Sequence, residues 1–169
     1  MLTALRHLVA ILLLPVVMAV VVPSWLLARF DSVDSRWDAV PALVWPMRTL
    51  GAILLVAGII MFAWCVSLFA RVGRGTLAPW DPTQNLVAVG PYRYVRNPMI
   101  SGVTAVLAGE VLLTGSRTLA LWLVLFVTVN FAYFVLVEEP GLERRFGAAY
   151  LDYKARVPRW IPRRVRHQQ

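Results

Sequence analysis

The chain has 169 residues, of which 59% are hydrophobic, and it carries a formal net charge of +8 at pH 7. Soluble domains are usually less than half apolar, so this composition excludes an ordinary soluble protein and indicates that lipid is the solvent. The excess of Lys and Arg fits flanks beside an anionic membrane. With no nucleic-acid-binding motif in the sequence, we expect no nucleic-acid partner. The single cysteine, Cys65, excludes an intrachain disulfide and a cysteine-based metal cluster, and we expect no metal.

The first apolar segment is uncharged from Leu8 to Leu27. It has about the 20 residues that a helix needs to cross the hydrocarbon core. Pro15 and Pro23 are tolerated in membrane helices. A cleaved signal peptide is the alternative, but the stretch is long for a signal core, and no small-x-small cleavage site clearly follows it. We therefore predict a transmembrane helix at about residues 8–28.

The second predicted helix covers residues 49–70, after a linker at 30–47 that contains three aspartates and two prolines. Gly51 and Gly58 lie two turns apart in it, which predicts close contact with another helix. Residues 71–97 follow as a long loop without helical periodicity. Loops of that length tend to be functional or disordered, and the aromatic residues of this one favour order.

Two further spans are predicted at residues 98–115 and 118–137, joined by a tight hairpin at Gly115 and Ser116 that makes them antiparallel neighbours. The third span contains Glu110. An acid within a span is a functional candidate by default, but this one lies near the outer end of its helix. We expect it to have a structural, hydrogen-bonding role.

Residues 138–169 are predicted to form a C-terminal cap. Apolar and aromatic side chains recur there at helical spacing while charged residues occupy the other faces, which predicts one amphipathic helix lying on the membrane or capping the bundle. The stripe consists of Leu142, Phe146, Tyr150, Tyr153 and Val157.

Together these segments predict a single all-α, polytopic domain of four transmembrane helices with the lipid bilayer as its partner. Arg and Lys are concentrated near the N-terminus, in the 71–97 loop and in the C-terminal cap. By the positive-inside rule, both termini and the loop are cytoplasmic, and the protein belongs in the inner membrane.

Candidate chemistry lies at the cytoplasmic ends of the last two spans. Asn97 and Pro98 form a helix start, with Asn as N-cap and Pro at the first helical position, whose unpaired N–H groups face any bound anion. Glu138 and Glu139 lie at the end of the fourth span. Either they form ion pairs at the surface, or they belong to a binding or catalytic site. The hairpin returns Glu138 to the face that carries Asn97, so a pocket between them suits a zwitterionic ligand. Adjacent helical residues lie about 100° apart, so we expect Glu138 to face the pocket and Glu139 the Arg-rich surface.

Two sequence blocks resemble the isoprenylcysteine carboxyl methyltransferase family, which is related to the phospholipid N-methyltransferases. The first runs over residues 86–98 and includes Gly-Pro-Tyr-Arg-Tyr-Val-Arg-Asn-Pro; the second begins at Glu138-Glu139-Pro140-Gly141-Leu142 and runs to Val157-Pro158-Arg159. The resemblance implies an integral-membrane methyltransferase that uses S-adenosylmethionine in a cytosol-facing pocket. The positions that it assigns to the cofactor are Leu86, Val87, Tyr92, Asn97, Pro98, Met99, Ile100 and Glu138.

The sequence departs from that family at two positions: Asn97 stands where His is usual, and Ile100 where Tyr is frequent. Asn97 hydrogen-bonds but does not titrate near neutral pH. We infer that the acceptor is either already anionic, such as a carboxylate or thiolate, or is deprotonated by Glu138 or Glu139, which are the catalytic candidates. The acceptor is a lipophilic or small carboxylate, thiol or amine at the cytoplasmic face.

Two alternatives stay open at this point. A membrane reductase would use NADPH, with Arg93 and Arg96 holding a phosphate. A non-catalytic membrane subunit would retain the fold alone, and the departure at Asn97 favours it.

Overall fold

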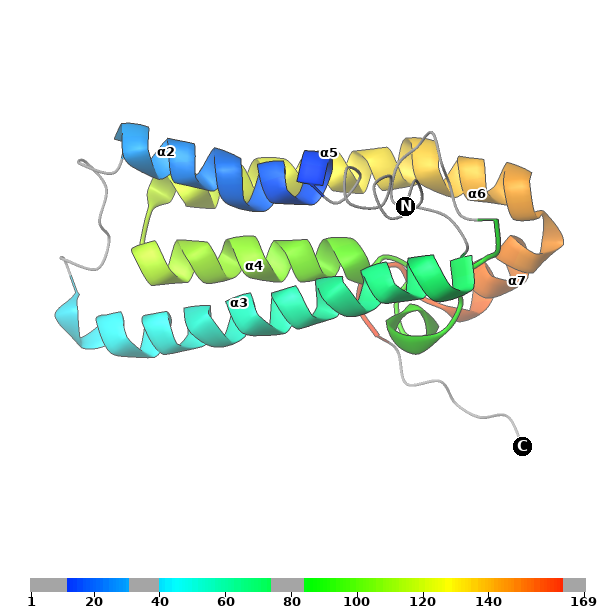
Figure 1. The fold of residues 1–169 in the computed structure, drawn as a ribbon, viewed down its shortest axis with the longest axis horizontal. Helices are drawn as coiled ribbons and strands as arrows, with labels where there is room; N and C mark the ends of the chain where they lie inside the picture. The colour runs from blue at the N-terminus through cyan, green and yellow to red at the C-terminus, as the bar shows by residue number, and fades with distance from the viewer. Residues whose placement is uncertain (1–11, 31–39, 74–83, 163–169) are drawn as a thin grey trace, which may run out of the picture.

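The computed structural model describes residues 12–30, 40–73 and 84–162, and every regular element in these ranges is a helix (Figure 1). The predicted all-α class is confirmed for this part of the chain. An α-helix satisfies its backbone hydrogen bonds within one segment, which lipid requires. Some of the charged residues behind the predicted topology lie outside the described residues. They are Arg6, the linker aspartates, Arg74 and the basic residues of the C-terminal tail.

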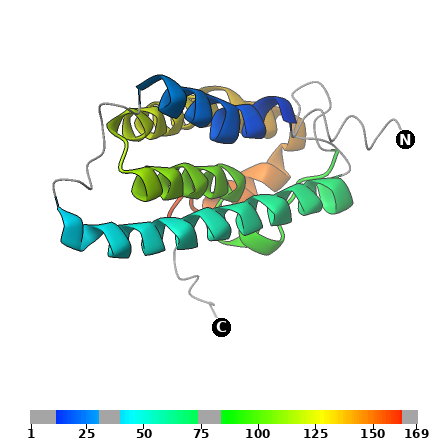
Figure 2. The ribbon, with the colours of Figure 1, turned by 60° about the vertical axis from the view of Figure 1, so that its left-hand side comes forward.

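The first predicted span begins as a π-helix, η1 (Leu12–Val21), and continues directly as α2 (Val22–Phe30). It lies alongside α5 (Arg117–Tyr133), as both ribbon views show (Figures 1 and 2). The indole Nε1 of Trp122 donates a hydrogen bond to the Met18 carbonyl over 3.1 Å. This bond fixes η1 against the bundle although the two residues are far apart in sequence.

The second predicted span begins earlier than expected. Helix α3 (Pro41–Leu68) starts at Pro41 rather than near residue 49, and it continues through the π-helix η4 (Phe69–Gly73). Proline at the first helical position loses no hydrogen bond, and Pro46 is accommodated within the second turn. The linker prolines therefore begin the helix instead of preceding it. The combined 33 residues are about 50 Å long, more than the hydrocarbon core requires.

Helix α4 (Pro98–Thr114) lies between α3 and the pair formed by α2 and α5 (Figure 2). Its contact with α3 depends on glycines, as predicted for Gly51 and Gly58. A Cβ atom added to Gly58 would lie 2.5 Å from the Gly102 carbonyl oxygen, and one added to Gly51 would lie 2.8 Å from that of Gly109. The two backbones thus touch without side chains between them, which is how apolar helices associate closely in lipid.

The predicted hairpin between the third and fourth apolar helices is confirmed. Helix α4 ends at Gly115, whose φ of 71° is readily adopted only by glycine. The Ser116 side chain then caps α5 by accepting a hydrogen bond from the Leu119 amide over 3.3 Å. Helix α5 passes into a third π-helix, η6 (Phe134–Glu138), and then into α6 (Glu139–Phe146).

The C-terminal cap contains two helices rather than the one predicted. Helix α6 ends at Gly147, which has φ 53° and ψ −131°, and α7 (Ala148–Arg156) starts again beyond it. This backbone conformation is incompatible with a continuous helix. The predicted apolar stripe nevertheless packs together: Tyr150, Tyr153 and Val157 are buried, with Leu142 and Phe146 against them.

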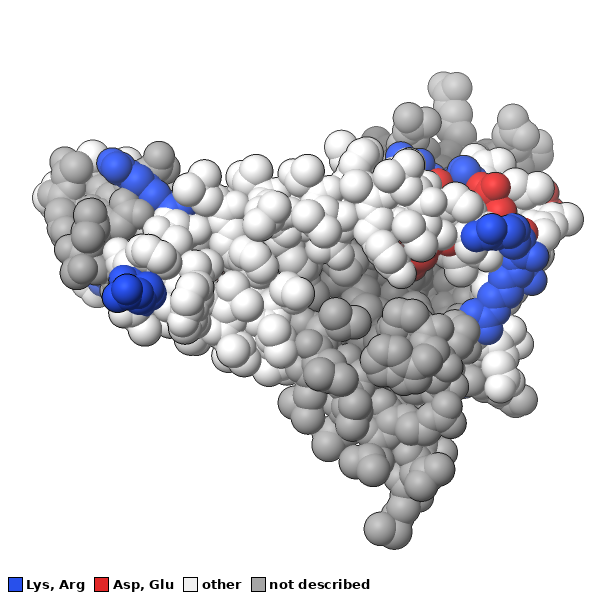
Figure 3. Space-filling view, turned by 90° about the horizontal axis from the view of Figure 1, so that it is seen from above, with Lys and Arg blue, Asp and Glu red and all other residues white. Residues whose placement is uncertain are grey.

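Two continuous helices of the described chain, Pro41–Gly73 and Arg117–Phe146, are long and apolar enough to cross a membrane. The apolar helices Pro15–Phe30 and Pro98–Thr114 are shorter. Many large apolar side chains of α3 and α5 are exposed, such as Trp45, Ile60 and Leu121. In Figure 3, Lys and Arg lie at both ends of the described surface, Asp and Glu lie at one end, and the length between the ends carries no charged residue on this face. Charged ends flanking an apolar surface are typical of a membrane protein.

Candidate functional site

A cavity of about 580 Å³ lies between η1, α3, α4 and α5. One end of it is polar, and we call the residues Tyr92, Arg96, Asn97 and Glu138 the polar end. The rest, which we call the apolar arm, runs toward the Trp122 end of α5. The lining of the arm consists of Pro15, Met18, Phe62, Phe69, Met99, Ile100, Val103, Trp122, Leu125, Phe126, Val129, Asn130 and Tyr133. Cavities of this size and character are typical of small-molecule sites.

The π-helix η6 places Glu138 at the polar end. In an uninterrupted α-helix, Glu138 would be rotated about 80° from Asn130, because eight residues turn roughly 800°. A π turn inserts one extra residue, so Glu138 takes approximately the direction of residue seven, about 20° from Asn130. Both residues line the cavity. The backbone irregularity in α5–η6 therefore brings a carboxylate onto the wall that α5 already forms.

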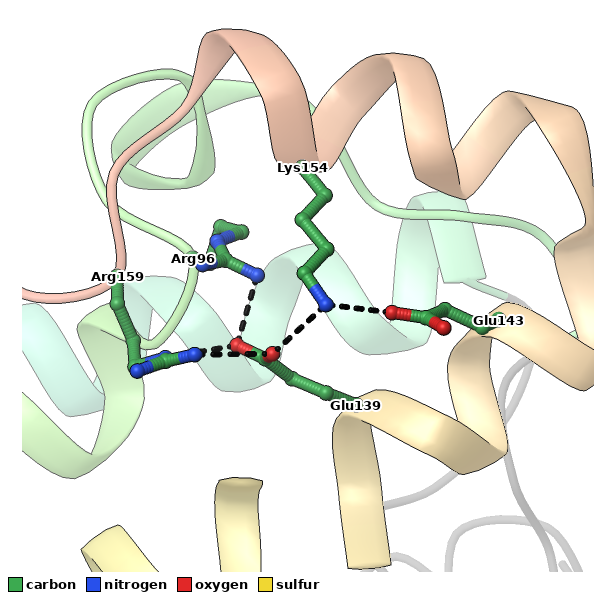
Figure 4. Close-up of polar contacts among 5 residues, drawn as sticks. All are labelled: Arg96, Glu139, Glu143, Lys154 and Arg159. Carbon is green, nitrogen blue, oxygen red and sulfur yellow. Dashed lines mark hydrogen bonds and ion pairs between the residues drawn. The ribbon is translucent and has the colours of Figure 1, made fainter. Parts of the chain in front are cut away.

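Glu139 is only 2% exposed and lies within a cluster of basic side chains (Figure 4). Its Oε1 is 2.7 Å from Nη1 of Arg96 and 2.8 Å from Nε of Arg159. Its Oε2 accepts from Nη2 of Arg159 over 3.1 Å and lies 3.3 Å from Nζ of Lys154, which also binds Glu143. We call these five residues the Glu139 cluster. It joins the segment before α4 to α6, α7 and the chain beyond α7.

Two further hydrogen bonds tie the C-terminal cap to the same segment. The Tyr153 hydroxyl donates to the Tyr92 carbonyl over 2.7 Å, and the Arg96 amide donates to the Pro158 carbonyl over 2.9 Å. Burial raises the pKa of Tyr153 and that of Tyr92, so both phenols stay protonated at neutral pH and Tyr153 remains a donor. The polar end of the cavity is thus held from behind by the cap.

Arg96 lies between the Glu139 cluster and the cavity. Its side chain is 7% exposed, one guanidinium nitrogen contacts Glu139, and the residue also lines the cavity. Its buried Nε has no hydrogen-bond partner among the described residues. The Tyr150 hydroxyl, also buried without a hydrogen-bond partner among the described residues, lies beside the same guanidinium. Three cationic groups also contact Glu139, which leaves positive charge available to an anion.

Comparisons with known proteins agree with this architecture. The phospholipid methyltransferase family matches residues 46–149, which include all the cavity residues except Pro15 and Met18. The chain belongs to this family of membrane methyltransferases. The resemblance inferred from the two sequence blocks is thereby confirmed at the level of the family.

The chain is also similar to methanethiol S-methyltransferase 2 of Bradyrhizobium diazoefficiens, with 26% identity over 147 residues. The match covers 76% of this chain and 53% of the relative, so the chain spans about half the length of the curated protein that it matches. No solved structure matches the chain.

The structure brings together five of the eight residues that the methyltransferase resemblance assigns to the cofactor. Those that line the cavity are Tyr92, Asn97, Met99, Ile100 and Glu138. Pro98 is buried at the start of α4. Leu86 packs on the buried tyrosines of α7, and Val87 packs with Cys65 and Tyr92 behind the cavity wall.

Asn97 acts as the N-cap of α4, as predicted. Its Oδ1 accepts a hydrogen bond from the Ile100 amide over 3.4 Å, and its carbonyl accepts from the Ser101 hydroxyl. One carboxylate oxygen of Glu110, Oε2, is buried without a hydrogen-bond partner among the described residues. The hydrogen-bonding role of Glu110 stays a prediction.

Sequence reasoning missed Arg96 as a cavity residue in a methyltransferase and missed Asn130 altogether. Asn130 carried a signal, since a polar side chain inside an apolar span tends to face the protein interior or a cavity. The spacing of Trp122, Phe126, Asn130 and Tyr133 also marks one face of α5. Glu139 was expected at the Arg-rich surface; its basic partners are as predicted, but it is buried.

Proposed function

We propose that this family member transfers a methyl group from S-adenosylmethionine to an acceptor in the apolar arm. The observation that carries the proposal is the pair of opposite charges at the polar end, where Glu138 and Arg96 line one cavity. The amino-acid part of S-adenosylmethionine is zwitterionic. Glu138 suits its ammonium group, and the unpartnered Nε of Arg96 suits its carboxylate, since charge-assisted hydrogen bonds are the stronger kind.

The bound cofactor would supply a methyl group activated by its sulfonium centre. The residues of the chain then have to align the two reactants and exclude water. The segment Asn97–Ile100, with Tyr92, supplies the wall that the family resemblance assigns to the cofactor. The aromatic and aliphatic side chains of the arm supply the dry surface for the acceptor.

The two carboxylates have different roles in this proposal. Glu138 contacts the cavity and is the candidate for binding the cofactor and for accepting a proton. Glu139 is committed to Arg96, Arg159 and Lys154, so we assign it to positioning rather than to the chemistry. Asn97 is engaged as a cap and is not a base.

We further propose that all four apolar helices cross or enter the bilayer and form one domain, with both termini and the polar end cytoplasmic. The support is the concentration of Arg and Lys in the segments that meet at the polar end. Three cavity residues of α5 are also substantially exposed, for example Leu125 at 53%. A lipophilic or small acceptor could therefore enter sideways from the lipid.

The reductase alternative has less support. Arg93 is exposed and is not among the cavity residues. The two arginines that were expected to hold a phosphate together therefore do not meet in this cavity.

The test is calorimetry on the purified full chain in nanodiscs, with S-adenosylmethionine, S-adenosylhomocysteine and NADPH as separate ligands. We expect one site for the first two and none for NADPH. Binding of NADPH alone would favour the reductase. Absence of binding by all three from a folded, monodisperse protein would favour the non-catalytic subunit.

A further inference from the structure

The apolar arm contains an amide, Asn130 of α5, among otherwise hydrophobic and aromatic neighbours. A polar side chain in a membrane helix is costly unless it has a partner or a function. Its Nδ2 donates to the Phe126 carbonyl over 2.8 Å. Because a carbonyl can only accept, this bond requires that the amide nitrogen faces the helix and thereby orients the group.

The Oδ1 atom of Asn130 is left with no hydrogen-bond donor among the described residues. The indole N–H of Trp122 is already bonded to the Met18 carbonyl, and the Tyr133 hydroxyl, one turn beyond Asn130, is another donor that α5 brings to the cavity. The amide oxygen of Asn130 itself offers a ligand only an acceptor. The natural complement is a ligand that brings a donor on an apolar body.

The direction of the α5 face adds a second constraint. Because of the π turn in η6, Asn130 and Glu138 lie on the same wall, about two turns apart. A carboxylate ligand at Asn130 would face an oxygen that cannot donate, on the wall that also carries the Glu138 carboxyl group. A neutral group with a proton on sulfur, nitrogen or oxygen can donate to that oxygen.

We propose that Oδ1 of Asn130 binds the X–H group of the methyl acceptor, so that the acceptor is a neutral thiol, amine or alcohol with an apolar body and not a carboxylate. This rests on the proposed function. Asn130 is thus a specificity-determining residue. Asn130 should bind the methylated product of a thiol or alcohol less tightly than the acceptor, because methylation removes the proton that Asn130 recognises.

The experiment measures binding rather than turnover. Full-length protein in nanodiscs is saturated with S-adenosylhomocysteine. Headspace gas chromatography measures the free concentration of two volatile isomers, 1-butanethiol and methyl propyl sulfide, and equilibrium dialysis measures that of butyrate. We expect the thiol to bind roughly threefold or more tightly than the sulfide, as one weak hydrogen bond allows, and butyrate to bind more weakly than both.

Asn130→Leu should abolish the preference for thiol over sulfide while S-adenosylhomocysteine affinity stays within twofold of wild type. Thr128→Val is the matched control, since the Thr128 hydroxyl bonds to the carbonyl four residues back on the exposed face of the same helix. It should keep the preference. Butyrate binding as tightly as butanethiol to wild type, or a preference that survives Asn130→Leu, would overturn the inference.

The outcomes distinguish a failure of the Asn130 proposal from a failure of the proposed function. Wild-type protein that binds S-adenosylhomocysteine but does not distinguish thiol from sulfide refutes the Asn130 site alone. Wild-type protein that distinguishes these ligands without binding S-adenosylhomocysteine refutes the proposed function and leaves Asn130 as an X–H site.

Discussion

The α3–α4 pair and the polar end of the cavity are assembled by opposite means. Helices α3 and α4 touch backbone to backbone at Gly58 and Gly102, with no polar group between them. The polar end is held by buried charge, with Glu139 between Arg96, Arg159 and Lys154. In lipid, apolar helices gain little from burying more apolar surface, so they depend on close packing. At the membrane boundary, charge and hydrogen bonds can position a segment that has no regular structure of its own.

This difference separates stability from specificity within one small domain. The glycine contact positions the wall that carries Ile100 and Val103, whatever ligand the cavity takes. The Glu139 cluster positions Tyr92, Arg96 and Asn97, which are the residues that a charged ligand would contact. Variants at the glycine contact should therefore impair folding, and variants at the polar end should also impair ligand binding.

Gly58→Leu should prevent folding, because even its Cβ would lie 2.5 Å from the Gly102 carbonyl oxygen, which is backbone and cannot move aside. Overpacking typically costs about 1–3 kcal/mol or more, and here two helices would have to separate. The measurement is the yield of monodisperse protein together with its thermal unfolding. Gly141→Ala is the control, since nothing lies within 4 Å of its added Cβ. A Gly58→Leu protein that melts like wild type would show that α3 and α4 do not meet as described.

Glu139→Gln should destabilise the protein by about 3 kcal/mol, since it removes the carboxylate shared by three cations and leaves Arg96 buried without its partner. The figure is at the low end for a buried pair, because Arg159 and Lys154 are partly exposed. Thermal unfolding and cofactor titration should both be impaired. Glu143→Gln is the control, as that carboxylate is 34% exposed and contacts Lys154 alone. Equal effects of the two variants would contradict the central position of Glu139.

Glu138→Gln should weaken S-adenosylmethionine binding by tenfold or more, the loss of roughly 1.5–3 kcal/mol expected for a charge-assisted hydrogen bond. Its melting temperature should stay near that of wild type, because Glu138 contacts the cavity and not the Glu139 cluster. Calorimetry and thermal unfolding on the same preparation separate the two effects. Unchanged cofactor affinity would move the cofactor away from this wall.

Tyr153→Phe should have the smallest effect of the four, about 1–2 kcal/mol in stability. It removes the donor to the Tyr92 carbonyl while keeping the packing of the ring. Cofactor affinity should fall only severalfold, since the Arg96–Pro158 and Arg96–Glu139 contacts remain. Tyr94→Phe is the control on an exposed tyrosine. A loss of binding as large as that of Glu138→Gln would mean that Tyr153 positions the site more than the Glu139 cluster does.

Elements with local signals could be predicted before the fold was known. Asn97 and Pro98 start α4, and Gly115 and Ser116 turn the chain into α5, because capping and positive-φ preferences act over a few residues. Glu138 and Asn97 could be placed on one face because an antiparallel hairpin has only one return direction. The family was also accessible from sequence, since its motif residues lie within two short blocks.

The points at which side chains of distant segments meet depend on how the helices pack. The π turn of η6 reorients Glu138, and no pattern in the sequence marks an inserted residue within an apolar helix. Gly147 divides the predicted C-terminal helix, and the fold alone shows which glycine of the segment does so. Arg96 meets Glu139, and Asn130 reaches the cavity, because helix packing brings together residues tens of positions apart. Hydrophobic periodicity shows which face of a helix is apolar, but it does not show which neighbouring helix that face will pack against.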